Sequence, residues 1–68
     1  MKYAIVIEKG ETSYGAYVPD LPGCVAVGKT RDEVFRLIKE AIIFHLEGIR
    51  EQGSAVPKPH SVIEYIEV

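Results

Sequence analysis

The stretch Tyr17-Val18-Pro19-Asp20-Leu21-Pro22-Gly23-Cys24 decides how this chain folds, because it places prolines, an Asp and a Gly between runs of strand-forming residues. Each proline holds its own φ near about −65°, lacks a backbone N–H and keeps the preceding residue out of the helical region. Pro22-Gly23 suits the central positions of a type II turn, since Gly accepts the positive φ of the second position. The stretch therefore predicts a rigid corner that neither a helix nor an internal strand can cross.

Strand-forming residues lie on both sides of this corner. Residues 3–7 are rich in β-branched and aromatic types and are followed by Lys9-Gly10-Glu11, which is typical of a hairpin loop. A second strand from about residue 13 to 18 ends at the corner, and residues 24–28 form a short third strand. Apolar residues on both faces of the first strand predict a central place in the sheet.

A helix is predicted next, from Thr30 to about Gln52. Thr30 and Glu33 match a capping box, in which the Thr hydroxyl accepts from the Glu33 amide and the Glu side chain reaches back to the Thr30 amide. Gly53 suits the left-handed position that follows a helix. Residues about 100° apart around the helix form an apolar stripe that should pack on the sheet: Val34, Phe35, Ile38, Ala41, Ile42, His45, Leu46 and Ile49.

The remaining residues predict an extended connection and a last strand. Prolines at positions 57 and 59 favour an extended backbone, and residues 61–68 read as a final strand. The whole order predicts an α+β fold, β-β-β-α-β, as one domain over residues 1–68 with one helix on one face of a small, mostly antiparallel sheet. A right-handed crossover through the helix would lay the last strand parallel to the first.

Composition limits the classes of function. The chain has 68 residues, 47% hydrophobic and 26% charged, which are ordinary values for one globular domain. Its net charge of −2 offers no basic footprint for nucleic acid, so direct nucleic-acid binding is not expected. A single Cys allows no internal disulfide, which fits a reducing compartment. No signal peptide or membrane span is visible, so we expect a cytoplasmic protein without membrane contact.

Few side chains suggest chemistry. Cys24 is best interpreted as a small buried residue, because a nucleophilic thiol needs a nearby base or a lowered pKa. His45 lies within the apolar stripe without a recognisable set of metal ligands, which favours a packed, hydrogen-bonded histidine. No catalytic, metal-binding or cofactor-binding residue is predicted. Beside the stripe, Leu37, Phe44 and Gly48 form a partly apolar flank. We expect self-association as a dimer or tetramer through this flank and the neighbouring sheet edge.

Taken together, these features resemble the HicB-like family of small antitoxins. The resemblance rests on the Pro-Asp-Leu-Pro-Gly-Cys run of residues 19–24, Gly28-Lys29-Thr30 at the helix entry, Glu40-Ala41-Ile42 and His45-Leu46-Glu47 within the helix, and the exit from Gly53 to Pro57-Lys58-Pro59.

That resemblance implies a partial RNase H-like fold and a role in a type II toxin-antitoxin system. The partner would be a HicA-like toxin that cleaves mRNA, and the antitoxin would act by occluding the toxin's RNA-binding surface. Many HicB-like antitoxins also carry a C-terminal DNA-binding segment, which these 68 residues do not include, so operator contact is not expected of them. At the corner, Asp20 and Leu21 are expected at an exposed tip and are predicted to contact the partner.

Two other classes of function stay open. One is a homo-oligomeric ligand-binding or regulatory module that uses the region beside the corner. The other is a nuclease, suggested only by analogy with the implied fold. Metal-dependent cleavage would need converging carboxylates, and the strands offer candidates without evident convergence: Glu8, Asp20, Glu64 and Glu67.

Overall fold

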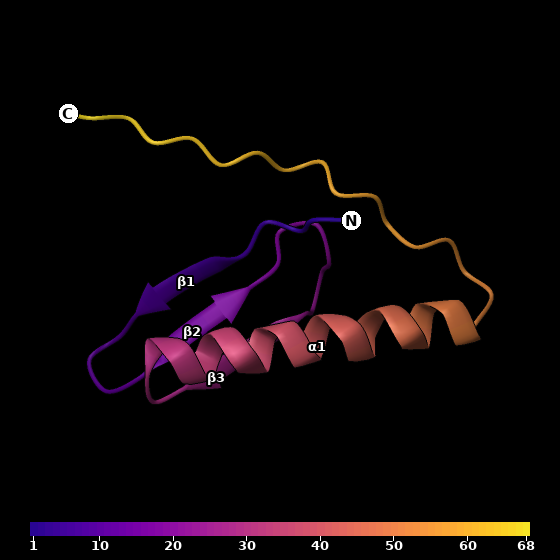
Figure 1. Cartoon of the computed structure of the whole chain (residues 1–68), viewed down its shortest axis with the longest axis horizontal. Helices are drawn as coiled ribbons and strands as arrows, with labels where there is room; N and C mark the ends of the chain where they lie inside the picture. The colour runs from indigo at the N-terminus through magenta and orange to yellow at the C-terminus, as the bar shows by residue number, and fades with distance from the viewer.

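The computed structural model describes residues 1–68 and shows a three-stranded sheet covered on one face by a single helix (Figure 1). The elements are β1 (Val6–Lys9), β2 (Tyr14–Tyr17), β3 (Val25–Gly28) and α1 (Arg31–Glu51). Both strand pairs are antiparallel and the sheet order is β1-β2-β3. The α+β class and the three strands followed by one helix are therefore confirmed.

The corner between β2 and β3 is built as the prolines and glycine predict. The Leu21 amide donates to the Val18 carbonyl and the Cys24 amide donates to the Leu21 carbonyl, each at 3.1 Å. Gly23 has φ +82°, the value that a turn with Gly in its second central position requires. A third bond from the Val18 amide to the Cys24 carbonyl, at 3.2 Å, closes the loop. Two consecutive turns thus join the neighbouring strands.

The ends of α1 also follow the sequence. The Thr30 hydroxyl accepts from the Glu33 amide at 3.0 Å, and the Glu33 carboxylate accepts at 2.9 Å from the Lys29 amide, one residue before the expected donor. Gly53 has φ +74° and donates to the Arg50 carbonyl at 3.0 Å, which ends the helix. No helix of the structure is long and apolar enough to cross a bilayer.

The core lies between α1 and the helix-facing side of the sheet. α1 packs mainly over β3 and β2 and touches β1 least. Close approach of β3 depends on Gly28, where a Cβ atom would stand 2.9 Å from the Val34 amide nitrogen. The buried cluster draws on the strands, the corner and the helix alike. Its members are Ala16, Val18, Leu21, Cys24, Val34 and Ile38.

Phe35 is the one residue of the predicted stripe that the structure places outside the packed face. Val34 and Ile38 are buried, and the rest of the stripe is partly buried, whereas Phe35 is 51% exposed. Phe35 points to the β1 side of the helix, where the sheet is covered least. The stripe is therefore confirmed apart from this position.

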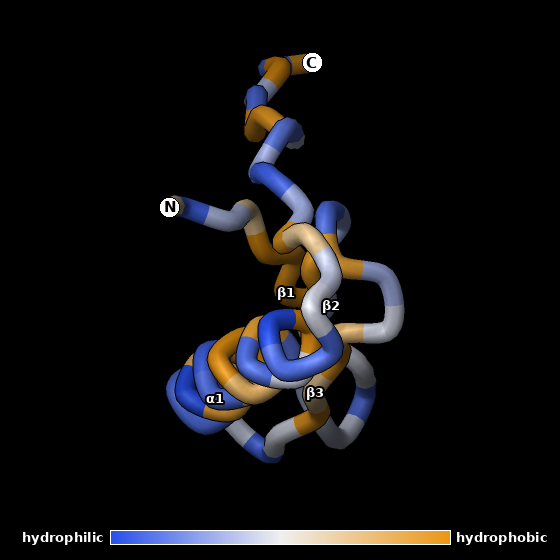
Figure 2. The backbone as a smooth tube through the Cα atoms, turned by 90° about the vertical axis from the view of Figure 1, so that its right-hand side faces the viewer, coloured by the Kyte–Doolittle hydropathy of each residue, from blue (hydrophilic) through white to orange (hydrophobic).

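The predicted last strand is wrong for this chain. Residues 61–68 are extended but join no sheet, so β1 is an edge strand and not a central one. After α1 the chain turns back and passes the start of β1, then separates from it toward the C-terminus (Figures 1 and 2). Because α1 lies over β3 and β2, a strand beside β1 would find little of the helix to pack on.

Ile38→Ala tests this core. Ile38 is 1% exposed, so its truncation leaves a cavity and should lower the free energy of unfolding by about 2–5 kcal/mol. Phe35→Ala, three residues earlier on the same helix at a half-exposed site, is the matched control and should cost much less. Urea denaturation followed by circular dichroism measures both. Equal losses for the two variants would contradict the packing described.

Candidate partner-binding surfaces

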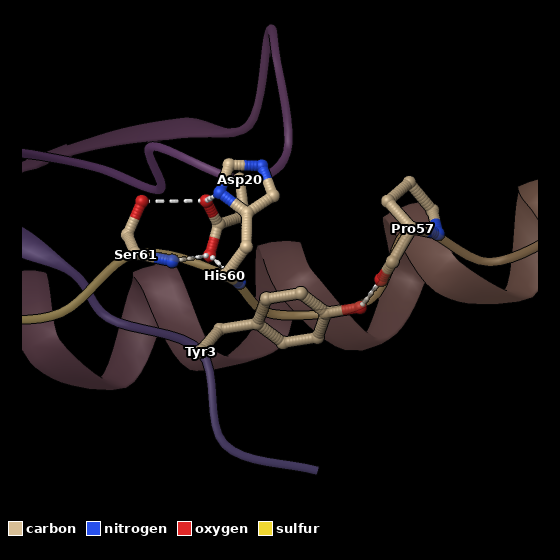
Figure 3. A network of polar contacts seen from close by, with 5 residues as sticks. All are labelled: Tyr3, Asp20, Pro57, His60 and Ser61. Carbon is tan, nitrogen blue, oxygen red and sulfur yellow. Dashed lines mark hydrogen bonds and ion pairs between the residues drawn. The ribbon is translucent and has the colours of Figure 1, made fainter.

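The most elaborate polar contact in the molecule is made by the Asp20 carboxylate, which holds the returning chain against the corner (Figure 3). One oxygen, Oδ2, accepts from the backbone amides of His60 at 2.9 Å and Ser61 at 3.0 Å. The other, Oδ1, accepts from the Ser61 hydroxyl at 2.6 Å and lies 3.0 Å from His60 Nδ1. We call this set of contacts the Asp20 clamp.

The clamp stabilises the charged form of Asp20. The Ser61 hydroxyl contributes most, followed by the Ser61 amide, with further help from the His60 amide and ring. These donors outweigh the opposing effect of burial and lower the pKa of Asp20 from 3.8 to about 2. A second contact lies close by, where the Tyr3 hydroxyl donates to the Pro57 carbonyl. Residues 57–61 are thus tied to the start of the chain and to the corner.

The expectation that Asp20 and Leu21 stand at an exposed tip is wrong. Asp20 is 4% exposed and Leu21 is 1% exposed. The two consecutive turns place Leu21 in the core, and the carboxylate of Asp20 is occupied by the hydrogen bonds of the clamp. Between Val18 and Cys24 the exposed residues are Pro19, Pro22 and Gly23. Partner contact through Asp20 or Leu21 stays a prediction, and in the free chain both residues are buried and structural.

The face of the sheet opposite α1 carries exposed apolar side chains. The register places Val6, Tyr17 and Val25 in one row and Glu8, Gly15 and Val27 in the row two positions along, so both rows share a face. Ala16 of the row between them is buried under the helix, which identifies the first two rows as the uncovered side. Tyr17 is 41% exposed, Val25 63% and Val27 68%. We call these six residues the outer sheet face.

The helix flank predicted for self-association is also accessible. Phe44 is 79% exposed, Leu37 is partly buried, and nothing lies within 4 Å of a Cβ atom built on Gly48. The flank therefore offers one protruding aromatic ring beside an open surface. Self-association through it stays a prediction.

The residues considered for chemistry do not form a reactive site. Cys24 is buried and burial raises the pKa of its thiol, as expected for a small core residue. His45 is half-buried. No group of three or more His, Cys, Asp or Glu side chains that could hold a metal ion is present, so the nuclease alternative gains no geometric support.

Sequence reasoning missed the Asp20 clamp and the outer sheet face. The partners of Asp20 lie 40 and 41 positions away along the chain, and no local pattern marks such a contact. The outer sheet face had a partial signal, since Val25 and Val27 alternate on one side of their strand. Only the pairing register of the strands shows that Tyr17 and Val6 lie on the same face of the sheet as these two valines.

Comparison with known proteins gives consistent matches. The model of a family described as a HicB-like antitoxin of a bacterial toxin-antitoxin system matches residues 3–68. The crystal structure of the N-terminal domain of Burkholderia pseudomallei antitoxin HicB is similar with a TM-score of 0.83 and 35% identity, covering 91% of this chain and 74% of that one.

Two relatives differ in length. An uncharacterized 14.9 kDa protein from the rep-hol intergenic region of Haemophilus phage HP1 is 44% identical over 66 residues, which are 97% of this chain and 50% of the phage protein. The chain thus spans half the length of that relative. A UPF0150 protein of Helicobacter pylori is 47% identical over 64 residues, which are 93% of this chain and 89% of that protein.

Asp20→Asn tests the clamp. The amide keeps the size of the side chain but removes the charge and puts a donor where an acceptor is needed. We expect much faster hydrogen exchange of the His60 and Ser61 amides, measured by NMR, with the amides of α1 unchanged. Asp32→Asn, the same change at an exposed position in the first turn of α1, is the control and should leave His60 and Ser61 protected.

The lowered pKa predicts a pH dependence. Because Asp20 titrates at about 2 in the folded chain and near 3.8 when unfolded, the clamp's contribution is fully present above pH 3.8 and is lost as the pH falls toward 2. A ¹³C NMR titration of the Asp20 carboxyl carbon should give a midpoint near 2. A midpoint at the unfolded value would show that the clamp does not form in solution.

Proposed function

We propose that this chain, which belongs to the HicB-like antitoxin family, neutralises a toxin by binding it, without catalysing a reaction itself. The toxin would be a HicA-like protein that cleaves mRNA, and binding would block its access to RNA. Such a partner acts in the cytoplasm, where we place this protein too. The family supports an antitoxin role, and the features below support a binding surface for the toxin.

The outer sheet face is the surface we assign to the toxin. A single helix covers one side of the sheet and leaves the other side open (Figures 1 and 2). The side chains of Tyr17, Val25 and Val27 lie there side by side across two strands, at 41%, 63% and 68% exposure. Contiguous exposed apolar residues on a small domain are typical of protein–protein interfaces. This uncovered apolar face is the observation that supports the proposal most.

Two further features suit an interface core. Gly15 sits between Glu8 and Val27 in its row, and nothing lies within 4 Å of a Cβ atom built on it, so the surface is open there. Tyr is among the residues that contribute most when buried at an interface. The chain is slightly acidic, with a net charge of −2, which favours approach to a basic RNA-binding surface. Apolar contact would then provide most of the affinity.

The experiment is a binding measurement with two charged substitutions. The Val25→Asp/Val27→Asp double variant should weaken binding to the co-encoded toxin at least about tenfold, since each buried unpaired charge opposes association. Isothermal titration calorimetry measures the affinity, and rescue of growth in cells that express the toxin measures neutralisation.

Ile43→Asp is the matched control. Ile43 is 50% exposed on α1, so the change is chemically the same but lies on the other side of the molecule. It should bind like the unmodified chain. Full neutralisation by the double variant would exclude the outer sheet face as the toxin site. Absence of toxin binding by the unmodified chain would contradict the proposed function itself.

A further inference from the structure

Gly15 lies in the middle strand of the sheet, where the fold itself does not require a glycine. Its φ is not positive, since only Gly23 and Gly53 have that conformation. Nothing lies within 4 Å of a Cβ atom built on Gly15, whereas Gly28 is held against the helix. A glycine inside a strand weakens the sheet, because it loses more backbone entropy on folding and packs no side chain. Such a glycine is typical of a place where another molecule approaches the backbone closely.

One charged side chain lies beside this open position. Glu8 is directly opposite Gly15 in the register and is the only charged residue of the outer sheet face. The neighbouring Lys9 belongs to the other side of the sheet, where it borders a hollow between β1 and α1. Neither ion pair of the structure involves Glu8. Its carboxylate is therefore exposed and has no cationic partner in the free chain.

Tyr17 completes the surroundings of Gly15. It follows Gly15 by two positions on β2, so the two residues share a face, and it is the diagonal neighbour of Glu8 across the strand pair. Diagonal neighbours in an antiparallel pair are about 7–8 Å apart, a distance that long side chains span. Tyr17 is 41% exposed. A carboxylate and an aromatic ring thus flank a position without a side chain, and we call these three residues the Gly15 niche.

The chemistry of the Gly15 niche favours one kind of group. A guanidinium pairs with a carboxylate through two parallel hydrogen bonds and also stacks on aromatic rings. A lysine ammonium is a compact, strongly hydrated charge that lacks the planar fork. An arginine that enters over Gly15 can therefore bind Glu8 and stack on Tyr17 at the same time. Arginine is also a common ligand of phosphate groups, which a protein that cleaves RNA must hold.

We propose, building on the proposed antitoxin function, that the Gly15 niche binds an arginine side chain of the toxin and that the Glu8 carboxylate takes the place of an RNA phosphate there. Val27 and Val25 lie beside the niche on β3, opposite Gly15 and Tyr17. Their burial in the complex excludes water from the niche, which strengthens the pairing of carboxylate and guanidinium. The bound arginine is then unavailable to RNA.

Binding to the co-encoded toxin tests the Gly15 niche with two variants that leave the core intact. Glu8→Gln removes the charge at an exposed site and should raise the dissociation constant at least about tenfold. Gly15→Val fills the niche with a residue that strands favour, so binding should weaken at least about tenfold while thermal stability stays equal or increases. Isothermal titration calorimetry measures binding, and thermal unfolding followed by circular dichroism measures stability.

Glu47→Gln is the matched control. Glu47 is exposed on α1, so this variant loses the same charge on the other side of the molecule. Its affinity for the toxin should stay within about twofold of the unmodified chain, because salt screens charges that lie far from the interface. A loss as large as that of Glu8→Gln would show that only the net charge matters and would overturn the niche.

A double-mutant cycle identifies the group that enters the niche. Each arginine and lysine of the toxin is replaced by alanine, and each replacement is measured with and without Glu8→Gln. For one arginine, the loss of affinity on replacement should become at least about fivefold smaller once Glu8 is changed, whereas Glu47→Gln should leave that loss unaltered. Coupling of Glu8 to a lysine alone would overturn the assignment to a guanidinium.

The outcomes separate the Gly15 niche from the proposed function. Normal toxin binding by both Glu8→Gln and Gly15→Val would overturn the niche. The proposed function would still stand in that case if the Val25→Asp/Val27→Asp variant binds weakly. Absence of toxin binding by the unmodified chain would overturn both.

Discussion

The arrangement of this molecule depends on the hydrogen bonds that the buried carboxylate of Asp20 accepts. It lies inside the corner between β2 and β3, and it accepts hydrogen bonds from residues 60 and 61, which belong to the opposite end of the chain. A buried carboxylate is costly unless donors surround it, and here backbone and side-chain donors supply that need. The clamp therefore determines where the chain passes after α1 and in which direction it continues.

A small core makes that constraint important. Only six apolar residues are buried, and they come from the corner, β2 and the first half of α1. The helix covers β3 and β2 better than β1, and the clamp directs residues 62–68 away from the sheet. Three apolar regions remain uncovered as a result: the outer sheet face, the hollow between β1 and Phe35, and residues 62–68. A domain of this size with so little buried surface would gain stability from association, which agrees with the proposed role in binding a partner.

Local patterns in the sequence predict the local structure well. The prolines and Gly23 predict the corner, Thr30 and Glu33 predict the helix start, and Gly53 predicts its end. The antitoxin family was also recognisable from the corner and the helix exit. These features depend on residues close together in the chain, whose preferred dihedrals and hydrogen bonds act without help from distant parts.

Distant contacts account for what the sequence did not reveal. Residues 61–68 have the composition of a strand, but whether they pair inside the chain depends on the clamp, which joins positions about forty residues apart. Asp20 looked like an exposed turn residue because Asp is common at such positions, and its actual partners lie in the returning segment. The exposure of Phe35 depends on which strands the helix covers, and the helical period alone does not contain that information.

The most direct test of this account is a measurement of scalar coupling across the hydrogen bond between the Ser61 amide nitrogen and the Asp20 carboxyl carbon, by a long-range NMR correlation experiment at neutral pH. The clamp predicts a detectable cross-peak that joins these two residues. Its absence, together with free exchange of the Ser61 amide with solvent, would contradict the claim that Asp20 holds the returning chain at the corner.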